Sequence, residues 1–314
     1  MSTEAGPIGV GAVGMRPDEE KTPLDDLPRD GRFRLTAFSD EGLEEGGPAE
    51  GDAAYYRDYN MLLQDPSVEL VLAGGPVELR RDFAVRALNA GRHVALAGRF
   101  CESALGAERV MKTALRAGLV ATADLRGRDD ADLRALRAAL EAENVGAVQG
   151  AFRYYAAPAP HDEAAPPGSL LEEAGLALLD QVHVLVRQDV KSVSAHLQRP
   201  YATAPDDGFL IYMPLRTGAW VVCQAVRGAA GELPSWRLYA PGATFTAEGG
   251  RAVVTAGGER RTYQPSLQEG FWDNLYAAVR EGADLKCHPA EIVRAMKLHE
   301  AALASAESGE AVTV

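Results

Sequence analysis

Cysteine is scarce in this chain. The three cysteines among 314 residues, Cys101, Cys223 and Cys287, are far apart and form no CxxC or Cys/His pair. This spacing argues against a zinc framework or a disulfide scaffold and is typical of proteins in a reducing compartment. The histidines also lack the spacing of metal ligands, so no metal site is expected.

Long apolar runs and positive charge are missing as well. No stretch approaches the about 18 consecutive apolar residues that a membrane helix needs, and no basic segment precedes an apolar run at the N-terminus. We therefore expect a cytoplasmic protein with no membrane partner. Asp and Glu outnumber Lys and Arg by 45 to 32, and the resulting net charge of −13 repels phosphate backbones. Nucleic acid is therefore not an expected partner, whereas a small-molecule substrate is.

The remaining composition is that of a folded, globular protein. Hydrophobic residues make up 46% of the chain, which is enough for a substantial core. Because single cores stop growing near about 250 to 300 residues, a chain of this length predicts two domains. A change of pattern near residue 125 places them at 1–124 and 125–314.

The first part alternates β-like runs with segments of helical periodicity. Arg81 to Ala90 and Ser103 to Ala117 repeat apolar residues every three or four positions, and Gly91 and Gly118 stand where helix C-terminal caps belong. This alternation predicts an α/β domain with a Rossmann-like, doubly wound parallel sheet. The expected strands are Ile8 to Val13, Arg34 to Phe38, Leu70 to Ala73, His93 to Leu96 and Leu119 to Ala123.

The second part begins and ends with helices and has strand-like runs between them. Turn signals such as Asp206-Asp207-Gly208 separate the runs. This order predicts an α+β domain with a large open, mostly antiparallel sheet. The expected helices are Asp130 to Glu143, Leu170 to Arg187, Gln268 to Glu281 and Pro289 to Ser308. The expected strands are Val145 to Tyr155, Ser192 to Gln198, Phe209 to Leu215, Ala219 to Val226, Trp236 to Tyr239, Thr244 to Ala247 and Ala252 to Thr255.

Four stretches resemble a known family of two-domain oxidoreductases. DYNMLLQDPSVELVLAGGP resembles its short helix, Asp-Pro turn and strand toward the cofactor, and ALNAGRHVALAGRF the segment before its Glu-Lys-Pro signature. NVGAVQGAF resembles the first sheet strand of its second domain, and LHEAALASAESGEAVTV its closing helix and tail. The chain thus resembles the Gfo/Idh/MocA family, which includes glucose-fructose oxidoreductase and inositol dehydrogenase, over nearly its whole length. The resemblance implies a nicotinamide cofactor and a sugar, cyclitol or related polyol substrate.

A glycine-rich segment, GVGAVG, begins close to the N-terminus. Such a fingerprint lets the backbone approach a pyrophosphate at a helix N-terminus. Asp40, at the end of the second strand, can bond an adenosine ribose hydroxyl and disfavour a 2′-phosphate, which favours NAD over NADP. The predicted cofactor contacts, including those that the resemblance implies, are Gly9, Gly11, Ala12, Val13, Gly14, Asp40, Gly74, Gly75, Pro76, Ala97 and Gly98.

The register of this fingerprint stays open. If Gly9 is its first glycine, only Pro7 and Ile8 precede it, and Asp40 lies 31 residues on instead of about 20 to 25. If the strand is Ile8 to Gly11, the loop begins at Ala12 and keeps a single glycine. Glycines that merely permit tight packing of strand and turn are the alternative to cofactor binding.

The catalytic signature that the resemblance implies is largely lost. Alignment on His93 places Ala97, Gly98 and Arg99 where Glu, Lys and Pro are expected, so the lysine is missing. Arg99 keeps a positive charge nearby as a candidate catalytic residue. A guanidinium stays protonated in proteins, so Arg99 cannot shuttle a proton.

A second motif retains only a histidine. In GLALLDQVHVLVRQD, His183 matches the family histidine, whereas Leu179 stands at the aspartate position. Asp180 and His183 are three residues apart and can share a helix face. We predict His183 as the acid/base residue, oriented by Asp180, with a structural histidine as the alternative.

Two arginines and a tyrosine are the candidate substrate residues. Arg126 follows the fifth strand, and Arg153 and Tyr155 lie on the first strand of the second sheet, where the resemblance places the substrate cleft. Arginines there suit an anionic substrate, because a guanidinium pairs bidentately with carboxylate or phosphate. Solvated arginines paired with neighbouring aspartates are the alternative.

Three functions follow from these patterns. The first is an NAD(P)-dependent oxidoreductase acting on a sugar, cyclitol or related polyol. The second is a non-catalytic protein that senses a ligand or acts as a scaffold, and the third is a non-redox enzyme, a lyase or isomerase, on the same fold. An open sheet face of alternating apolar residues needs a cover, so a homodimer or homotetramer is expected.

Overall fold

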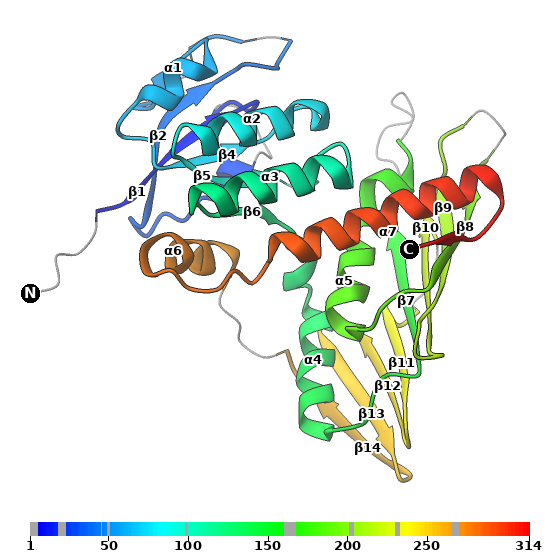
Figure 1. Ribbon diagram of the computed structural model, residues 1–314. Helices are drawn as coiled ribbons and strands as arrows, with labels where there is room; N and C mark the ends of the chain where they lie inside the picture. Colours follow the sequence, from blue (N-terminus) through cyan, green and yellow to red (C-terminus); the bar gives the residue numbers. More distant parts are fainter. Residues whose placement is uncertain are drawn as a thin grey trace, which may run out of the picture. The chain divides into compact units, whose positions relative to one another are not determined.

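The computed structural model describes residues 6–17, 23–44, 46–48, 51–97, 100–159, 168–200, 204–229, 233–265 and 270–314. The chain forms two units, coloured along the sequence in Figure 1. Unit 1 consists of Met1–Leu125 and Glu269–Val293, and unit 2 of Arg126–Gln268 and Arg294–Val314. Within the described part of the chain, every helix is too short or too polar to cross a bilayer.

Unit 1 is built on a six-stranded parallel sheet, which confirms the predicted doubly wound α/β fold. Its strands follow the order β3-β2-β1-β4-β5-β6. The chain reverses direction across the sheet at β1, so the loops after β1 and β4 lie side by side at their carboxyl ends. The strands are β1 (Ile8–Val13), β2 (Phe33–Ser39), β3 (Ala54–Tyr55), β4 (Leu70–Ala73), β5 (His93–Ala97) and β6 (Ala121–Asp124).

Helices cover both faces of this sheet. The helix α1 (Tyr59–Gln64) packs against Gly11, whereas α6 (Phe271–Glu281) packs through Leu275 against the face that carries Ile8 and Val10. The helices α2 (Val77–Asn89) and α3 (Ala104–Ala117) run side by side (Figure 1). As predicted, Gly118 caps α3 in the left-handed conformation, with φ of 66°.

The position of α6 corrects the predicted second domain, 125–314. Aromatic residues at the start of α6 explain why it belongs to unit 1. The rings of Phe33 and Trp272 meet edge to face at 5.2 Å, and Phe33 also meets Tyr276 at 5.9 Å. Arg280 pairs with Glu69 at 2.6 Å, and Arg32 with Asp273 at 2.6 Å. These contacts hold the helix on the first sheet although it comes from the last part of the chain.

Unit 2 contains a nine-stranded sheet, which confirms the predicted large and mostly antiparallel sheet. Only the central pair β7 and β10 is parallel, and the order is β14-β13-β12-β11-β7-β10-β9-β8-β15. The strands are β7 (Gly150–Ala157), β8 (Ser192–Gln198), β9 (Gly208–Pro214), β10 (Trp220–Arg227), β11 (Trp236–Ala240), β12 (Ala243–Glu248), β13 (Arg251–Ala256), β14 (Glu259–Tyr263) and β15 (Val312–Thr313).

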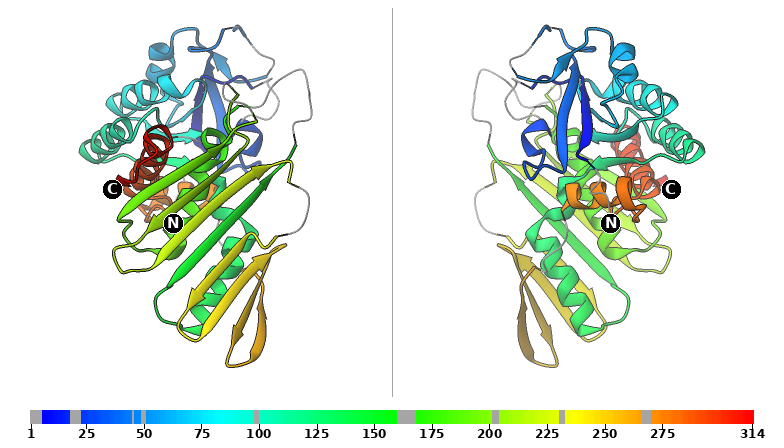
Figure 2. Two further views of the ribbon diagram at one scale, coloured as in Figure 1. Left: turned by 90° about the vertical axis from the view of Figure 1, so that its right-hand side faces the viewer. Right: turned by 90° about the vertical axis from the view of Figure 1, so that its left-hand side faces the viewer.

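The helices of unit 2 lie on one face of this sheet and leave the other open, as the left view of Figure 2 shows. They are α4 (Ala131–Glu143), α5 (Leu176–Val186) and α7 (Pro289–Ser308), whose first residues are counted with unit 1. The predicted helix Leu170 to Arg187 begins with a π turn, Leu171–Gly175. His299 Nε2 lies 3.0 Å from the Leu171 carbonyl oxygen beside this widened turn.

Candidate functional site

Four of the predicted cofactor residues, Gly9, Gly11, Ala12 and Val13, lie inside β1. Gly9 pairs with Arg34 and Gly11 with Ala37 in the sheet, and Ala12 follows them. A Cβ atom on Gly9 would lie 1.7 Å from the Ser67 carbonyl oxygen, and one on Gly11 would lie 2.8 Å from the Leu62 side chain. Both glycines therefore allow close packing on the strand. Of the two registers left open, the one that has Gly9 and Gly11 in the strand agrees with β1, although the strand continues through Val13.

The loop after β1 begins at Gly14 and contacts the loop after β4. Gly14 and Gly75 both adopt the left-handed conformation, with φ of 67° and 68°. A Cβ on Gly14 would lie 2.9 Å from the Gly74 carbonyl oxygen, and one on Gly75 would lie 2.9 Å from the Gly14 carbonyl oxygen. The two loops thus lie backbone against backbone. This contact places three predicted cofactor residues, Gly14, Gly74 and Gly75, at one edge of the sheet.

Two side chains occupy positions where a fingerprint has small residues. Met15 is 3% exposed, and its methyl group would lie 2.4 Å from a Cβ on Gly74. Arg16 Nη1 donates to the Gly47 carbonyl oxygen at 3.1 Å, which joins the β1 loop to the loop between β2 and β3. Residues 14–17 and 23–32 contain one 3₁₀ turn, Pro23–Asp26, and no α-helix. Within these residues no α-helix N-terminus can receive a pyrophosphate, and Arg16 is a cation close to Gly14 in the sequence.

Asp40 is held in a fixed position directly after β2. Its carboxylate is largely buried, and Oδ2 accepts a hydrogen bond from the Tyr55 hydroxyl at 2.9 Å. Burial and this contact raise the pKa of Tyr55, so its hydroxyl stays protonated as the donor. A Cβ on Gly46 would lie 1.9 Å from Oδ2, so the glycine lets the loop pass close to the carboxylate. Asp40 and Tyr55 line a cavity of about 440 Å³.

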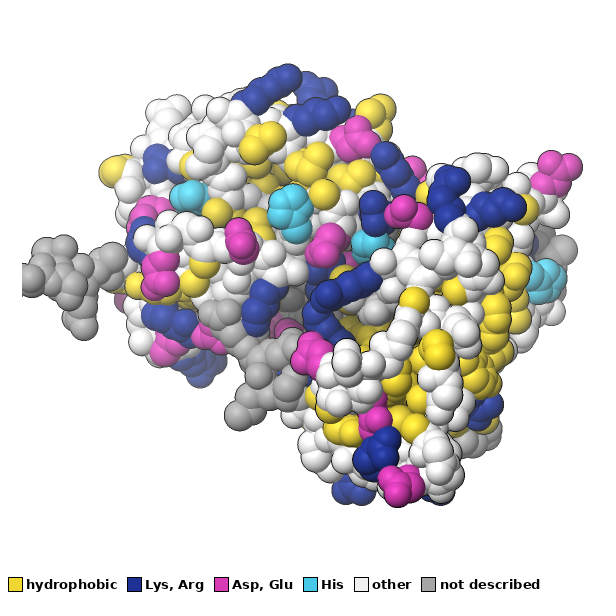
Figure 3. Space-filling model, turned by 60° about the horizontal axis from the view of Figure 1, so that its bottom comes forward, with side chains coloured by type: hydrophobic (Ala, Val, Ile, Leu, Met, Phe, Trp, Pro, Cys, Tyr) yellow, Lys and Arg dark blue, Asp and Glu magenta, His cyan; other side chains and the backbone are white. Residues whose placement is uncertain are grey.

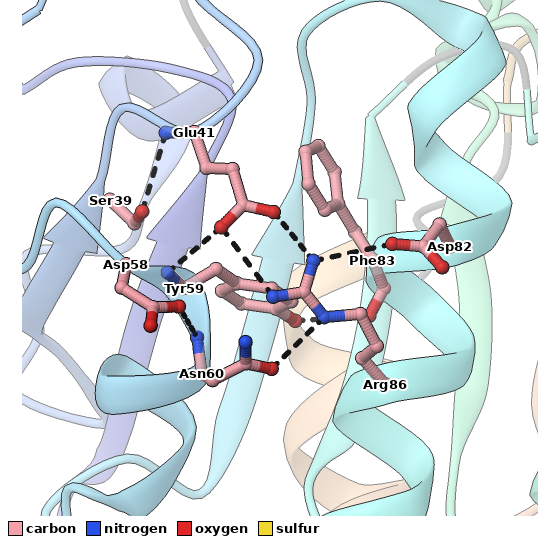
Figure 4. Close-up of polar contacts among 8 residues, drawn as sticks. All are labelled: Ser39, Glu41, Asp58, Tyr59, Asn60, Asp82, Phe83 and Arg86. Atoms are coloured by element: carbon pink, nitrogen blue, oxygen red, sulfur yellow. Dashed lines mark hydrogen bonds and ion pairs between the residues drawn. The ribbon is translucent and has the colours of Figure 1, made fainter.

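The neighbouring carboxylate, Glu41, contacts α1 and α2 (Figure 4). Its Oε2 accepts from the Tyr59 backbone N–H at 3.0 Å, and its Oε1 pairs with Arg86 at 2.5 Å. The Arg86 guanidinium also lies 4.8 Å from the centroid of the buried Tyr59 ring. Glu41 therefore fixes the start of α1, and Asp40 remains the carboxylate suited to a ribose hydroxyl.

The three residues at the expected Glu-Lys-Pro positions, Ala97, Gly98 and Arg99, lie mostly outside the described part of the chain. Ala97 ends β5, and nothing is described of its side chain, of Gly98 or of Arg99. Pro76 is the residue before α2. Arg80 donates through Nε to the Gly75 carbonyl oxygen at 3.0 Å, which holds the loop that Pro76 follows.

Asp180 has a partner that the sequence did not predict. It is 1% exposed, and its two oxygens accept from Arg128 Nε at 2.8 Å and from Arg128 Nη2 at 2.7 Å. This bidentate pair joins α5 to the 3₁₀ turn η2 (Arg126–Asp129). Asp180 therefore holds Arg128 through both of its oxygens, and its role in orienting His183 stays a prediction. His183 lies one helical turn further along α5 and is partly buried.

Arg153 is a buried cation and not a cleft residue, which corrects its prediction as a substrate ligand. It is 4% exposed, and its Nε donates to Gln181 Oε1 at 2.8 Å. Its guanidinium also donates to the Ser235 carbonyl oxygen at 3.1 Å and lies 5.0 Å from the centroid of the Trp236 ring. Burial lowers the pKa of Arg153 from its ordinary value. All these partners belong to the interior of unit 2.

The other two substrate candidates are Tyr155 and Arg126. Tyr155 packs partly buried against the core of unit 2, and nothing is described of the Arg126 side chain. Sequence reasoning missed Gln181, whose Nε2 donates to the Gly127 carbonyl oxygen at 2.6 Å. Gln181 thus links η2 to Arg153, and no sequence signal pointed to it. Among the described residues, no group of three His, Cys, Asp or Glu side chains could hold a metal ion.

A nicotinamide dinucleotide fits the residues at the carboxyl edge of unit 1. Asp40 offers a carboxylate for a ribose diol, and Gly14 and Gly75 keep the backbone free of Cβ atoms. Arg16 offers a guanidinium that can pair with a phosphate. These groups can meet the hydroxyls and phosphates of an adenosine diphosphate.

The chain is similar to known oxidoreductases over nearly its whole length. No protein-family profile matches it. It is 27% identical to inositol 2-dehydrogenase 2 of Saccharopolyspora erythraea over 303 residues, which cover 90% of this chain and 86% of that protein. Its fold matches an NAD-binding protein from Listeria innocua with a TM-score of 0.78 at 20% identity, covering 98% and 96% of the two chains. It also matches the aldose-aldose oxidoreductase of Caulobacter crescentus with a TM-score of 0.77 at 17% identity, covering 98% and 100%.

Proposed function

We propose that this protein is a nicotinamide-dependent oxidoreductase that acts on a sugar, cyclitol or related polyol. The observation that carries the proposal is the similarity to an inositol 2-dehydrogenase along 90% of the chain. The carboxyl edge of the unit 1 sheet supports it, because that edge brings together the glycines and the aspartate that an adenosine diphosphate needs.

Each residue has a separate role in this proposal. Asp40 would accept hydrogen bonds from the ribose hydroxyls, and Arg16 would donate to a pyrophosphate oxygen in place of the Gly47 carbonyl oxygen. When bound, the nicotinamide would accept a hydride from the carbon that bears the substrate hydroxyl. His183 takes the hydroxyl proton as the general base, and Arg128 and Asp180 hold the helix that carries it.

Titration calorimetry with NAD, NADH, NADP and NADPH tests the cofactor assignment. We expect NAD and NADH to bind more tightly than the phosphorylated forms, because the Asp40 carboxylate repels a 2′-phosphate. Arg16→Ala is expected to weaken NAD binding about tenfold or more, since it removes a charge-assisted contact. Arg34→Ala, at an exposed arginine of β2 in the same unit, is the matched control and should bind as the wild type does. An Arg16→Ala protein with unchanged affinity would contradict this role.

A non-catalytic ligand sensor is the second candidate. Two observations favour it: Arg128 binds both carboxylate oxygens of Asp180, and Arg153 is buried among Gln181, Ser235 and Trp236. Polar groups expected to meet a substrate are thus occupied inside unit 2. A screen of polyols with NAD separates the candidates, because only the oxidoreductase yields stoichiometric NADH. Product formed without a change in nicotinamide absorbance would instead indicate a non-redox enzyme.

We also propose that the protein is a homodimer or homotetramer assembled through the open face of the unit 2 sheet. The centre of that face is aromatic, with Phe152 4.9 Å from Trp220 and Trp220 6.0 Å from Tyr239 between ring centroids. Leu210 and Tyr212, each 41% exposed, extend it. Figure 3 shows hydrophobic side chains gathered over this sheet at the right of the view. Because the chain carries a charge of −13, two copies meet less repulsion at this aromatic patch, where the charged neighbour opposite Phe152 is Arg237.

Light scattering after size-exclusion chromatography tests this interface. The double variant Leu210→Lys and Tyr212→Lys is expected to run as a monomer, because the assembly would bury like charges without partners. Leu233→Lys, at a leucine that is 59% exposed and lies outside the sheet, is the control and should keep the wild-type mass. A monomeric wild type, or a double variant that still assembles, contradicts the proposal.

A further inference from the structure

A basic groove runs between α2 and α3 on unit 1, away from the glycines and Asp40 described above. It encloses about 520 Å³. Arg81 contributes from α2, and Arg109, Lys112 and Arg116 contribute from α3. The chain as a whole has a net charge of −13, so a groove lined by four cations differs in charge from the rest of the surface.

The cations of α3 form one stripe. Leu105, Arg109, Lys112 and Arg116 follow each other at intervals of four, three and four residues, which places them along a single side of a helix. All four are exposed, and Leu105 is 76% exposed. The opposite side of α3, with Ala107 and Val110, is buried in unit 1. The stripe is therefore the outer surface of a helix that is firmly packed on its inner side.

Neighbouring carboxylates neutralise only part of this charge. Arg81 pairs with Glu102 at 2.7 Å, and Lys112 pairs with Glu108 at 3.5 Å. The guanidinium groups of Arg109 and Arg116 have no hydrogen-bond or ion-pair partner among the described residues. Their Cα atoms are about 10 Å apart along the helix, and both side chains are long enough to converge on one ligand.

We infer that the α2–α3 groove is a second ligand site, which binds a small polyanion with at least two oxyanion groups, phosphate or carboxylate. The planar guanidinium group suits both chemistries, because its fork of N–H donors matches two oxygens at once. Arg109 and Arg116 each hold one oxyanion group, and Arg81 adds positive charge from the facing helix. The Thr113 hydroxyl, which donates to the Arg109 carbonyl oxygen at 2.8 Å, lines the groove between the two arginines.

Calorimetric titration of the full chain with inorganic pyrophosphate and with citrate tests this site at low ionic strength. Saturable binding is expected for at least one probe, and it should weaken as sodium chloride is added. The double variant Arg109→Glu and Arg116→Glu is expected to lose at least tenfold in affinity. Its matched control, Arg251→Glu and Arg260→Glu on the exposed β13–β14 hairpin, changes the net charge equally and should bind as the wild type does.

The two probes identify the ligand chemistry. Binding of pyrophosphate alone indicates a phosphate-bearing ligand, and binding of citrate alone indicates a polycarboxylate. No saturable binding of either probe would overturn the inference, and so would equal losses in the double variant and its control. Because pyrophosphate could also reach Arg16, each titration is repeated with Arg16→Ala, in which binding at the groove should persist.

Discussion

Replacing Arg128 with alanine is expected to lower the free energy of unfolding of unit 2 by about 3 to 5 kcal/mol. The variant leaves the Asp180 carboxylate, which is 1% exposed, without the two charged hydrogen bonds that hold it. Arg128 is itself only 13% exposed, so water cannot replace the guanidinium at low cost. The loss is therefore larger than the about 0 to 1 kcal/mol typical of an exposed ion pair.

Urea unfolding followed by tryptophan fluorescence measures this effect. Trp220 and Trp236 belong to unit 2, so a Trp272→Phe background restricts the signal to that unit. Arg260→Ala, at an exposed arginine of β14, is the control and should stay within about 0.5 kcal/mol of its parent. The double variant Arg128→Met and Asp180→Leu should recover most of the loss, because it removes both charges together. An Arg128→Ala protein as stable as the control would show that the pair contributes little.

Replacing His183 with alanine is expected to lower kcat for polyol oxidation by about 10² to 10⁴, because the substrate hydroxyl loses its general base. NAD affinity should not change, since the cofactor residues lie on another unit of the chain. Steady-state kinetics with the best polyol of the screen, combined with calorimetry, measure both quantities. This result rests on the proposed oxidoreductase function.

Two further measurements separate chemistry from folding. Added imidazole should restore part of the His183→Ala activity, which a structural defect would not allow. His196→Ala, at an exposed histidine of β8, should keep the wild-type rate. Full turnover in the His183→Ala variant would remove His183 from the mechanism and leave the base unassigned.

The fold was predictable from local signals along the sequence. The bounds of β1, Ile8–Val13, and of α7, Pro289–Ser308, agree with the apolar periodicity, and the left-handed Gly118 caps α3 as expected. The strand β14 was not predicted, because its sequence ERRTY carries three charges at the edge of the sheet. Its Arg261 pairs with Glu143 of α4 at 2.6 Å, a contact that alternation along the strand cannot reveal.

The candidate site was predictable only in part. The sequence indicated Gly14 and Asp40, since both follow buried strands. It could not indicate that Arg128 reaches Asp180, because the two residues are 52 positions apart and meet only through the fold. The prediction that Arg153 binds substrate failed for another reason. On strand β7 the aromatic Phe152 faces outward, and the charged Arg153 faces the core. That inversion arises because buried partners of Arg153 come from α5 and β11.

The position of α6 has a consequence for how the protein is made. Phe33 packs against Trp272 of α6, a residue about 240 positions later in the chain. Its side of the first sheet is therefore covered only after α6 has been synthesised. At about 5 to 20 residues per second, a ribosome needs roughly 12 to 48 s to synthesise that interval. During this time the nascent first sheet exposes an apolar face, which is a surface for chaperones. A fragment that stops at residue 125 would keep that face uncovered permanently, and we expect it to aggregate.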